Sequence, residues 1–360
     1  MKLRERITIV LFCGFLLSVM LCYLFLPKTD FSENEKRYLE EMPSLTWESV
    51  ASGDWGSSIE TYLADHIPGR DFFVGVNAYF NLFTGRQAGE DIWLKGSKLI
   101  EAPVSEDSEA IARNVSAVNK FAETIGQQVD LMVISSAGWA MGLTDYHDDA
   151  IIDGIITQAE EPVQPVDVTD VFAGRPELYY DTDHHWTSEG AYEGYKAYME
   201  SQGKAYRDES DFEKAIFAKF QGSTYSRSAL WLTSPEELEL WQSDSQLTVT
   251  NGESEGTHEG VFYWDRLEEA DKYTVFLDGN HSIVRVHNPE GTGKLLVIRD
   301  SYSNSLGCFL AESYEEVVLI DLRYYRQPVS QLVAEEAFDD ILVCYSIGNF
   351  LTDTNLVWLR

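Results

Sequence analysis

Four short and almost wholly apolar runs constrain the fold more than any other feature of this sequence. They are VDLMVIS at 129–135, KLLVIR at 294–299, VVLID at 317–321 and ILVCY at 341–345. Runs of this length without polar alternation are typical of strands buried on both faces. Helical patterns separate some of them, as at 303–313 and 329–338. Such alternation predicts an α/β domain with three layers, in which helices cover both faces of a parallel sheet.

The N-terminal segment predicts where this domain lies. Residues 7–26 read ITIVLFCGFLLSVMLCYLFL, an uncharged run of about the length that crosses a bilayer. Basic residues stand at positions 2, 4 and 6, so the positive-inside rule predicts a single-pass anchor with a cytoplasmic N-terminus and an extracytoplasmic domain. A cleaved signal peptide is the alternative. Its apolar core is normally shorter and ends at small residues, whereas this run ends at Leu26.

Charge and cysteine content narrow the functional classes. The formal net charge is −33, which argues against a nucleic-acid partner, because phosphates require cationic side chains. Acidic residues that keep an exported domain soluble explain this charge more simply than a specific cationic partner does. The four cysteines show no zinc spacing and no disulfide framework. Cys13 and Cys22 lie in the apolar segment, while Cys308 and Cys344 are either buried core thiols or a disulfide pair.

The order of these patterns predicts three regions. Residues 1–28 form a cytoplasmic tip and transmembrane anchor, and residues 29–104 form a juxtamembrane segment with short helices. Residues 105–360 form the large α/β domain. Within it, residues 208–289 are rich in Trp, Tyr, Ser and Thr and contain hairpin-like runs such as 273–276. We therefore expect a partly β insertion beside the sheet.

A polar motif just before a predicted helix supplies candidate chemistry. In DTDHHWT, at 181–187, Thr187 has the features of a helix N-cap, so the motif lies in extended or turning chain. Residues i and i+2 of an extended chain point to the same side. Asp183 and His185 are then expected to face one cleft while His184 faces away. Asp183 would bind the Nδ1–H of His185 and leave Nε2 free as a general base.

The nucleophile that such a pair would serve is expected at the C-terminal end of a parallel strand, where α/β sheets place their sites. Ser301 follows the buried run 294–299 and precedes a helical pattern. Unpaired backbone N–H groups at the start of that helix would stabilise an oxyanion by roughly 3–4 kcal/mol per donor. Because serine alone is a weak nucleophile, the His–Asp pair is required. We therefore predict a triad of Ser301, His185 and Asp183.

Each of these residues also has a structural interpretation. Most Asp-x-His pairs are hydrogen-bonded surface or core groups, and Ser301 has the features of a helix N-cap. Ser303 and Ser305 are rival nucleophiles inside the helix. A metal site at the motif would need a distant third ligand such as His281 or His287, and no HExxH-like spacing occurs, so we expect neither metal nor cofactor. The neighbouring aromatic residues either belong to the core or line the cleft: Tyr179, Tyr180 and Trp186.

The run YYDTDHHWT at 179–187 also resembles the signature of the DHHW-motif proteins, relatives of the alginate O-acetyltransferases and of SGNH-hydrolase-like proteins. The resemblance spans nearly the whole chain and implies an SGNH-hydrolase-like, flavodoxin-like fold. It also implies the same triad, with Asp and His preceding Ser in the chain. Four further blocks resemble the family in the same order: FSENEKRYLEEMPSL at 31–45, YLADHIPGRD at 62–71, GSTYSRSAL at 222–230 and LLVIRDSYSNS at 295–305.

Two departures from the acetyltransferase pattern bear on the site. Arg299 stands where a glycine usually precedes the nucleophile block, which affects the local oxyanion geometry. His184 replaces a smaller residue between Asp and His, so it could share or take the role of base. With Trp186 and Tyr302, these two residues are the auxiliary candidates for the site.

The resemblance implies acyl transfer to a cell-surface polysaccharide or exopolysaccharide of a bacterial cell envelope. His185 would deprotonate Ser301, which takes an acetyl group from a donor and passes it to a sugar hydroxyl. The related systems imply an integral-membrane acyltransferase as partner. Two alternatives stay open: an acetyl esterase with the same triad, and a non-catalytic carbohydrate-binding or scaffold subunit. In the second, exposed aromatic residues would stack on sugars: Trp231, Trp241 and Trp264.

Overall fold

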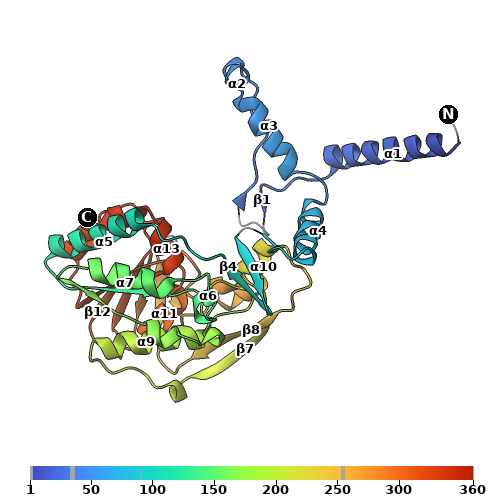
Figure 1. Ribbon diagram of the computed structural model, residues 1–360. Helices are drawn as coiled ribbons and strands as arrows, with labels where there is room; N and C mark the ends of the chain where they lie inside the picture. The colour runs from blue at the N-terminus through green and yellow to red at the C-terminus, as the bar shows by residue number, and fades with distance from the viewer. Residues whose placement is uncertain (1–2, 33–36, 90, 253–255, 360) are drawn as a thin grey trace. The chain divides into compact units, whose positions relative to one another are not determined.

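The computed structural model describes residues 3–32, 37–89, 91–252 and 256–359 (Figure 1). The chain divides into two compact units. The smaller unit comprises Met1–Glu90 and Tyr225–Leu232, and the larger comprises Asp91–Thr224 and Thr233–Arg360. The motif at 181–187 and Ser301 both lie in the larger unit.

An eight-stranded sheet forms the centre of the larger unit. Strands β13, β12, β14, β5 and β6 are parallel neighbours, and β11, β9 and β10 extend the sheet with antiparallel pairing. The prediction of an α/β domain is therefore confirmed, although the sheet is mostly and not wholly parallel. Across the sheet the strands are β10 (His258–Glu259), β9 (Thr248–Asn251), β11 (Ile283–His287), β13 (Glu316–Ile320), β12 (Lys294–Arg299), β14 (Asp340–Ser346), β5 (Val129–Ile134) and β6 (Val163–Pro165).

Alternating side chains of the central strands enter two separate cores, one on each face of the sheet. In β12, Leu295 and Val297 belong to one core and Leu296 and Ile298 to the other. Figure 1 shows α5 and α9 on opposite sides of the strands. The helices on the α5 side are α5 (Ser108–Ile125), α7 (Asp148–Gln158), α12 (Val329–Glu335) and α13 (Ile347–Thr352), and those on the other side are α9 (Ser188–Ser201) and α11 (Ser303–Leu310).

The expected insertion at 208–289 lies only partly beside the sheet. Its strands β7 (Glu213–Phe220) and β8 (Glu236–Gln242) form a separate antiparallel hairpin, whereas β9, β10 and β11 continue the main sheet. The prediction of a hairpin-like run at 273–276 is wrong. This run forms the 3₁₀ turn Lys272–Val275, and the left-handed φ angles of Leu277 and Asp278, +55° and +63°, are incompatible with a continuing strand.

Shorter elements complete the larger unit. The hairpin of β3 (Ile92–Lys95) and β4 (Lys98–Glu101) precedes α5. Two four-residue helices, α6 (Ala137–Ala140) and α8 (Thr169–Phe172), follow β5 and β6 respectively. Helix α9 begins as expected, because the Thr187 hydroxyl accepts a hydrogen bond from the Gly190 N–H at 3.1 Å and so caps the first turn.

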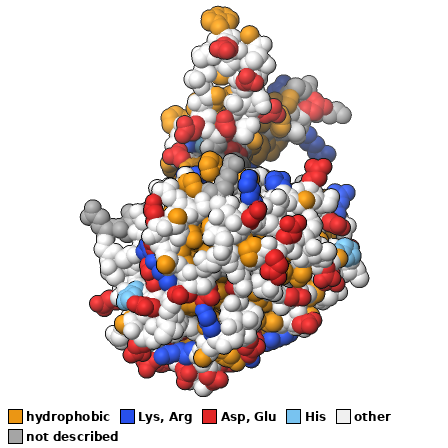
Figure 2. All heavy atoms as spheres, turned by 90° about the vertical axis from the view of Figure 1, so that its left-hand side faces the viewer, with side chains coloured by type: hydrophobic (Ala, Val, Ile, Leu, Met, Phe, Trp, Pro, Cys, Tyr) orange, Lys and Arg blue, Asp and Glu red, His pale blue; other side chains and the backbone are white. Residues whose placement is uncertain are grey.

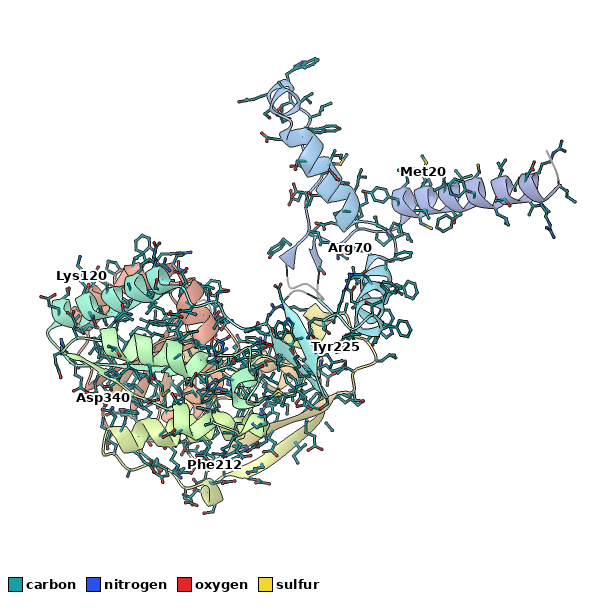
Figure 3. The ribbon with its side chains drawn as sticks, in the orientation of Figure 1. Met20, Arg70, Lys120, Phe212, Tyr225 and Asp340 are labelled. Carbon is teal, nitrogen blue, oxygen red and sulfur yellow. The ribbon has the colours of Figure 1, made fainter. Side chains whose placement is uncertain are left out.

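The smaller unit is mainly helical. Among the residues that the structure describes, α1 is the one helix long and apolar enough to cross a membrane, and a signal sequence passes the same test. None of its residues is buried, and Met20 projects from it (Figure 3). The other elements are β1 (Phe31–Ser32), β2 (Arg37–Tyr38), α2 (Trp47–Ser52), α3 (Asp54–Asp65) and α4 (Arg70–Phe83), with α1 at Leu3–Phe25 and α10 (Ser223–Ser228) at the boundary between the units.

Candidate active site

A closed turn presents the Asp-His motif. Tyr179 and Trp186 pair as an isolated antiparallel bridge, and the Tyr180 N–H donates to the His185 carbonyl at 3.2 Å. The chain between them therefore bends back on itself and is not extended. The Lys98 side chain donates to the Tyr179 carbonyl at 2.7 Å, which fixes the base of this turn to strand β4.

Asp183, His185 and Ser301 form one hydrogen-bonded chain. His185 Nδ1 lies 2.5 Å from Asp183 Oδ1, and His185 Nε2 lies 2.8 Å from Ser301 Oγ. A carboxylate can only accept, so Nδ1 carries the proton and Nε2 accepts from the Ser301 hydroxyl. The three residues are 3%, 5% and 9% exposed, respectively. This is the geometry in which an imidazole takes a proton from a serine while a carboxylate holds its tautomer.

The serine lies in the turn that joins β12 to α11. Strand β12 ends at Arg299 and α11 begins at Ser303, with Tyr302 as N-cap and no side-chain cap bond. Ser301 therefore does not act as the N-cap, and its hydroxyl binds the imidazole. The two rival serines are core residues: Ser303 is fully buried, and Ser305 accepts from the indole N–H of Trp186 at 2.9 Å.

Asp300 fixes this turn, a role that sequence reasoning missed. Its Oδ1 accepts from the Tyr302 N–H at 3.0 Å. Its Oδ2 accepts from the Ser346 N–H, the Ser346 hydroxyl and the Asn349 amide at 2.7–2.8 Å. The carboxylate thereby ties the start of α11 to the end of β14. An acidic residue directly before the candidate serine was the available signal.

The Asp183 carboxylate is held as an anion. Burial by itself would raise its pKa, but the neighbouring His185 and His184 and the hydrogen bond from the Ser223 N–H outweigh that effect, so its pKa lies well below the ordinary value. The Ser223 N–H donates to Oδ2 at 2.6 Å, opposite the oxygen that binds His185. The carboxylate is thus ready to stabilise a positive imidazolium.

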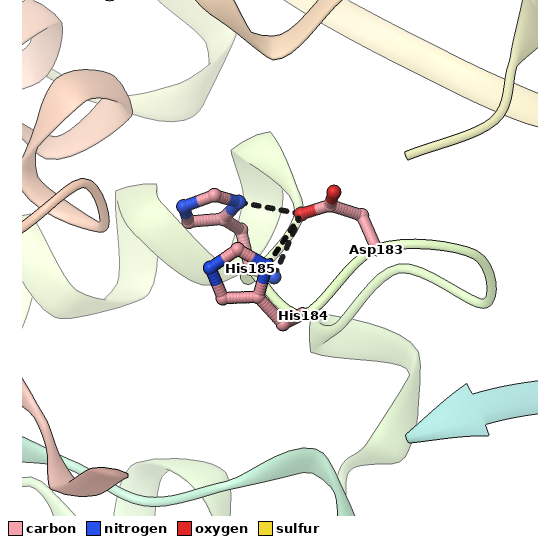
Figure 4. A group of neighbouring side chains, drawn as sticks. All are labelled: Asp183, His184 and His185. Atoms are coloured by element: carbon pink, nitrogen blue, oxygen red, sulfur yellow. Dashed lines mark hydrogen bonds and ion pairs between the residues drawn. The ribbon is translucent and has the colours of Figure 1, made fainter. Parts of the chain in front are cut away.

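The prediction that His184 faces away is wrong. Its ring lies beside that of His185, with 3.8 Å between centroids, and its Nδ1 lies 3.6 Å from Asp183 Oδ1 (Figure 4). The reason is the bent backbone, since alternation of sides requires extended chain. His184 Nδ1 contacts the Ser223 hydroxyl at 2.5 Å, while His185 is the imidazole that contacts Ser301.

Aromatic side chains surround the imidazole. Tyr273 stacks on His185 with 3.8 Å between centroids and 5° between planes, and this residue was not predicted. The Tyr302 hydroxyl donates to the His184 carbonyl. Trp186 is fully buried and donates to the Tyr302 carbonyl at 3.0 Å, so it supports the turn from the core.

The remaining aromatic candidates divide between core and surface. Tyr179 and Tyr180 are buried at 1% and 2% exposure. Trp241 is also buried, so its expected role in stacking on sugars is wrong. Trp231 and Trp264 remain partly exposed.

Arg299 is a buried residue, fully shielded from solvent. Burial lowers the pKa of its guanidinium, which donates to Asn280 Oδ1 at 2.8 Å and lies 4.0 Å from Asp321. The Asn304 amide also donates to Asn280 Oδ1, at 3.2 Å. The guanidinium therefore orients Asn280. It forms no hydrogen bond with the side chain of Asp183, His185 or Ser301.

The motif also contains atoms that could ligate a metal. Ligand atoms of Asp183, His184 and His185 lie within 4.8 Å of one another, and in the described part of the chain neither His281 nor His287 joins them. Both carboxylate oxygens of Asp183 already accept N–H bonds, from His185 and Ser223. A metal would have to displace these donors, so the residues fit a triad better than a metal centre.

Cys308 and Cys344 are buried free thiols in this structure. The Cys308 Sγ–H donates to the Asn304 carbonyl at 3.3 Å. Burial raises the pKa of both thiols. Of the two alternatives, core thiols or a disulfide pair, the structure contains the first.

The fold and this geometry define an α/β protein with a serine–histidine–aspartate arrangement where a parallel strand meets a helix. The model of the DHHW protein family matches residues 171–320, a segment that contains Asp183, His185 and Ser301. The resemblance to the DHHW proteins is confirmed. A comparison with curated proteins found no match.

Solved structures share the fold. A DHHW family protein from Eubacterium siraeum is 20% identical, with TM-score 0.65, over 74% of this chain and 93% of that one. PatB1 of Bacillus cereus, solved with a sulfonyl adduct, is 17% identical, with TM-score 0.64, over 75% and 98%. The O-acetyltransferase domain of Pseudomonas putida AlgJ is 14% identical, with TM-score 0.45, over 73% and 92%, a likeness too low to support a conclusion.

Proposed function

We propose that this chain is an extracytoplasmic O-acetyltransferase that modifies a cell-surface polysaccharide or exopolysaccharide through a covalent acetyl-serine. One observation carries the proposal. The His185 imidazole bridges Asp183 Oδ1, at 2.5 Å, and Ser301 Oγ, at 2.8 Å, in a largely buried setting. A hydroxyl, an imidazole and a carboxylate in this order form the apparatus of acyl transfer.

In the first half-reaction, Ser301 Oγ attacks the carbonyl carbon of an acetyl donor while its proton passes to His185 Nε2. The tetrahedral intermediate carries its negative charge on the former carbonyl oxygen. The expectation of unpaired N–H donors at the start of α11 is wrong, because the N–H groups of Tyr302 and Ser303 donate to Asp300 and that of Asn304 donates to the Ser301 carbonyl. The intermediate collapses, the donor group leaves with the proton from His185, and an acetyl ester on Ser301 remains. Asp183 stabilises the imidazolium throughout.

In the second half-reaction, a sugar hydroxyl replaces the leaving group. His185 Nε2 accepts the hydroxyl proton as the sugar oxygen attacks the acetyl carbon. As the intermediate collapses and the bond from Ser301 Oγ to the acetyl carbon breaks, His185 gives that proton to Ser301 Oγ. The products are an O-acetylated sugar and the free serine. Water in place of the sugar would yield acetate, which is the reaction of an esterase with the same residues.

The resemblances support this assignment. The DHHW family model covers the segment with all three residues, and the sequence blocks resemble relatives of the alginate O-acetyltransferases. PatB1, which shares the fold, forms a sulfonyl adduct. Sulfonyl reagents react with activated nucleophilic side chains, and a serine whose hydroxyl is hydrogen-bonded to an imidazole is one of these.

The N-terminal helix suggests where the enzyme works. We infer that α1 anchors the chain in the cell membrane, with the larger unit outside the cytoplasm, because basic residues at positions 2, 4 and 6 precede its long apolar run. The acetyl donor would then arrive from an integral-membrane acyltransferase. A tethered enzyme would remain close to such a partner.

Product analysis on the full chain in detergent tests the proposal. The protein is incubated with 4-nitrophenyl acetate, with and without a neutral oligosaccharide acceptor, and mass spectrometry identifies acetylated sugar, free acetate and acetylated protein. In parallel, a sulfonyl fluoride probe is applied to wild type, to Ser301→Ala and to Ser303→Ala. Ser303 is the matched control, since it lies two residues away and is fully buried.

The expected result is acetylated sugar, with labelling of wild type and Ser303→Ala but not of Ser301→Ala. Acetate alone, at a rate that the acceptor does not change, would make the chain an esterase. Neither product nor label on a chain with a native circular dichroism spectrum would contradict enzymatic function and favour a binding or scaffold subunit.

A further inference from the structure

Helix α4, at Arg70–Phe83, exposes an aromatic stripe to solvent. Its five members are 45–89% exposed although each is apolar. At about 100° of rotation per residue, all five fall within one stripe about 100° wide along the helix. We call these residues the α4 stripe: Phe72, Phe73, Val76, Phe80 and Phe83. An exposed apolar stripe of this size marks an interaction surface more often than chance.

The edge of the stripe at Phe72 already has a packing partner, because the Trp231 ring stacks on Phe72 with 5.8 Å between centroids. Gly75 and Ala78 are buried, and a Cβ on Gly75 would lie 1.7 Å from the Trp231 ring, so the indole packs directly against the helix backbone. The Tyr79 hydroxyl accepts from the Leu232 N–H at 2.7 Å. These contacts lie within the smaller unit. They fix the helix along the edge of the stripe that includes Phe72, and all five stripe residues stay 45–89% exposed.

The start of α4 lies beside the end of the apolar helix α1. Residues from both places line one pocket within the smaller unit. Cys22 belongs to the last turn of α1 and Leu26 directly follows that helix, whereas Ile67 and Arg70 lie at the start of α4. The point at which α1 would leave the hydrocarbon is therefore next to the point at which α4 begins.

The local charge differs from that of the chain as a whole. The formal net charge is −33, and acidic side chains are spread over the face seen in Figure 2. From position 67 to position 88, in contrast, the charged residues are Arg70, Asp71 and Arg86, with a net charge of +1. The segment that carries the stripe thus lacks the acidity that would repel anionic headgroups.

From these observations we infer that the α4 stripe docks into the lipid–water interface, with α4 lying in the membrane plane beside the anchor. This inference rests on the proposed anchoring by α1. A helix with an exposed apolar face buries that face at the boundary of headgroups and acyl chains. Outside the stripe, α4 exposes the polar residues Asp71 and Asn77 and also the apolar Val74. Two attachments would hold the smaller unit at a defined height above the membrane, where one tether would leave it free to tilt.

Site-directed spin labelling of the full chain tests the docking. The protein carries Cys13→Ala and Cys22→Ala, since these cysteines are exposed, whereas Cys308 and Cys344 are buried. It is reconstituted in vesicles of phosphatidylethanolamine and phosphatidylglycerol. A nitroxide is placed at Phe80→Cys in the stripe.

Two further positions serve as controls. Asn77→Cys is the matched control at an exposed polar position of α4 outside the stripe, and Leu16→Cys reports on the anchor. Power saturation measures how often the nitroxide collides with oxygen, which concentrates in lipid, and how often it collides with a water-soluble nickel complex. We expect the oxygen-to-nickel ratio at position 80 to exceed that at position 77 several-fold and to approach that at position 16.

Each other outcome overturns the docking and identifies the cause. A lipid signal at position 16 with equal ratios at 77 and 80 would leave the anchor intact and the stripe in water. A water signal at position 16 would remove the anchoring itself. Protection of position 80 from both reagents would mean that a protein covers the stripe. Dipolar broadening between labels would show that this protein is a second copy of the chain. None of these readouts depends on turnover, so they are separate from the test of acetyl transfer.

Discussion

Gly222 is the backbone position at which one added methyl group would most directly disturb the candidate triad. A Cβ at this residue would lie 2.1 Å from Asp183 Oδ2 and 2.5 Å from the carboxyl carbon of Asp183. The carboxylate has little freedom to yield, because its oxygens accept from both the backbone and the ring of His185 and from the Ser223 N–H. We therefore predict that Gly222→Ala displaces the carboxylate by roughly 1 Å, a shift that disrupts catalysis from outside the reacting groups.

The size of the effect follows from this geometry. A misplacement of about 1 Å reduces turnover on the order of 100-fold, which corresponds to about 2.7 kcal/mol of transition-state stabilisation. The same methyl group overpacks a buried site, so the free energy of unfolding should fall by about 1–3 kcal/mol. Turnover should therefore fall while the protein still folds.

Two measurements on each variant separate these effects. Steady-state hydrolysis of 4-nitrophenyl acetate gives kcat, and urea titration gives the free energy of unfolding. Gly154→Ala is the matched control, since nothing lies within 4 Å of a Cβ added at that position in α7. It should keep wild-type turnover and gain up to about 1 kcal/mol of stability from the lower entropy of the unfolded chain. A folded Gly222→Ala protein with wild-type kcat would refute the reasoning that the carboxylate position sets the reactivity of the serine.

Three further predictions concern charge and burial. Asp183→Asn should keep the native circular dichroism spectrum but lower turnover on the order of 10⁴-fold, because an amide favours the wrong imidazole tautomer. Hydrogen bonds from Arg285, joined by Lys294, lower the pKa of Glu336 to about 2, so the unfolded chain binds more protons below the ordinary glutamate pKa of about 4.3. Urea titrations should therefore show the free energy of unfolding decreasing as the pH is lowered from about 4.3 to 2. The decrease should be smaller in Glu336→Gln. Burial raises the pKa of the Cys344 thiol, so mass spectrometry should detect its alkylation by iodoacetamide only after unfolding.

The central strands could be predicted because their signal is local. The run 294–299 is apolar on successive residues, and its side chains enter the cores on both faces of the sheet. The antiparallel extension gave no such signal. Strand β9 is four residues long, and its partner β11 begins 32 residues after β9 ends, so only the folded chain shows that they pair.

In the candidate site, too, some features had a local signal in the sequence and others did not. The contact of Asp183 with His185 was predicted from i and i+2 spacing in extended chain, but a bent turn makes it, in which Asp183 Oδ1 accepts from both the backbone and the ring of His185. The end of an apolar strand was the signal that nominated Ser301. The position of His184 depended on a turn closed by the hydrogen bond from the Tyr180 N–H to the His185 carbonyl, which no local pattern indicates. Tyr273 is 88 residues from the imidazole on which it stacks, so sequence reasoning had no reason to select it.

The surroundings of Arg299 show how the chain accommodates an arginine where the acetyltransferase pattern has a glycine. A buried guanidinium is unfavourable unless it is paired and hydrogen-bonded. Here Asn280 accepts from it at 2.8 Å and Asp321 lies 4.0 Å away, whereas its Nε has no hydrogen-bond partner among the described residues. Asn280 reaches the guanidinium from a loop in which Leu277 and Asp278 adopt left-handed φ angles, and strained backbone of this kind persists only where its surroundings fix it. Arginine in place of glycine therefore joins the end of β12, from which the Ser301 turn projects, to that loop. Asn280 also accepts from Asn304 of α11, and we therefore propose that Arg299 positions the start of that helix and does not act on the reacting atoms.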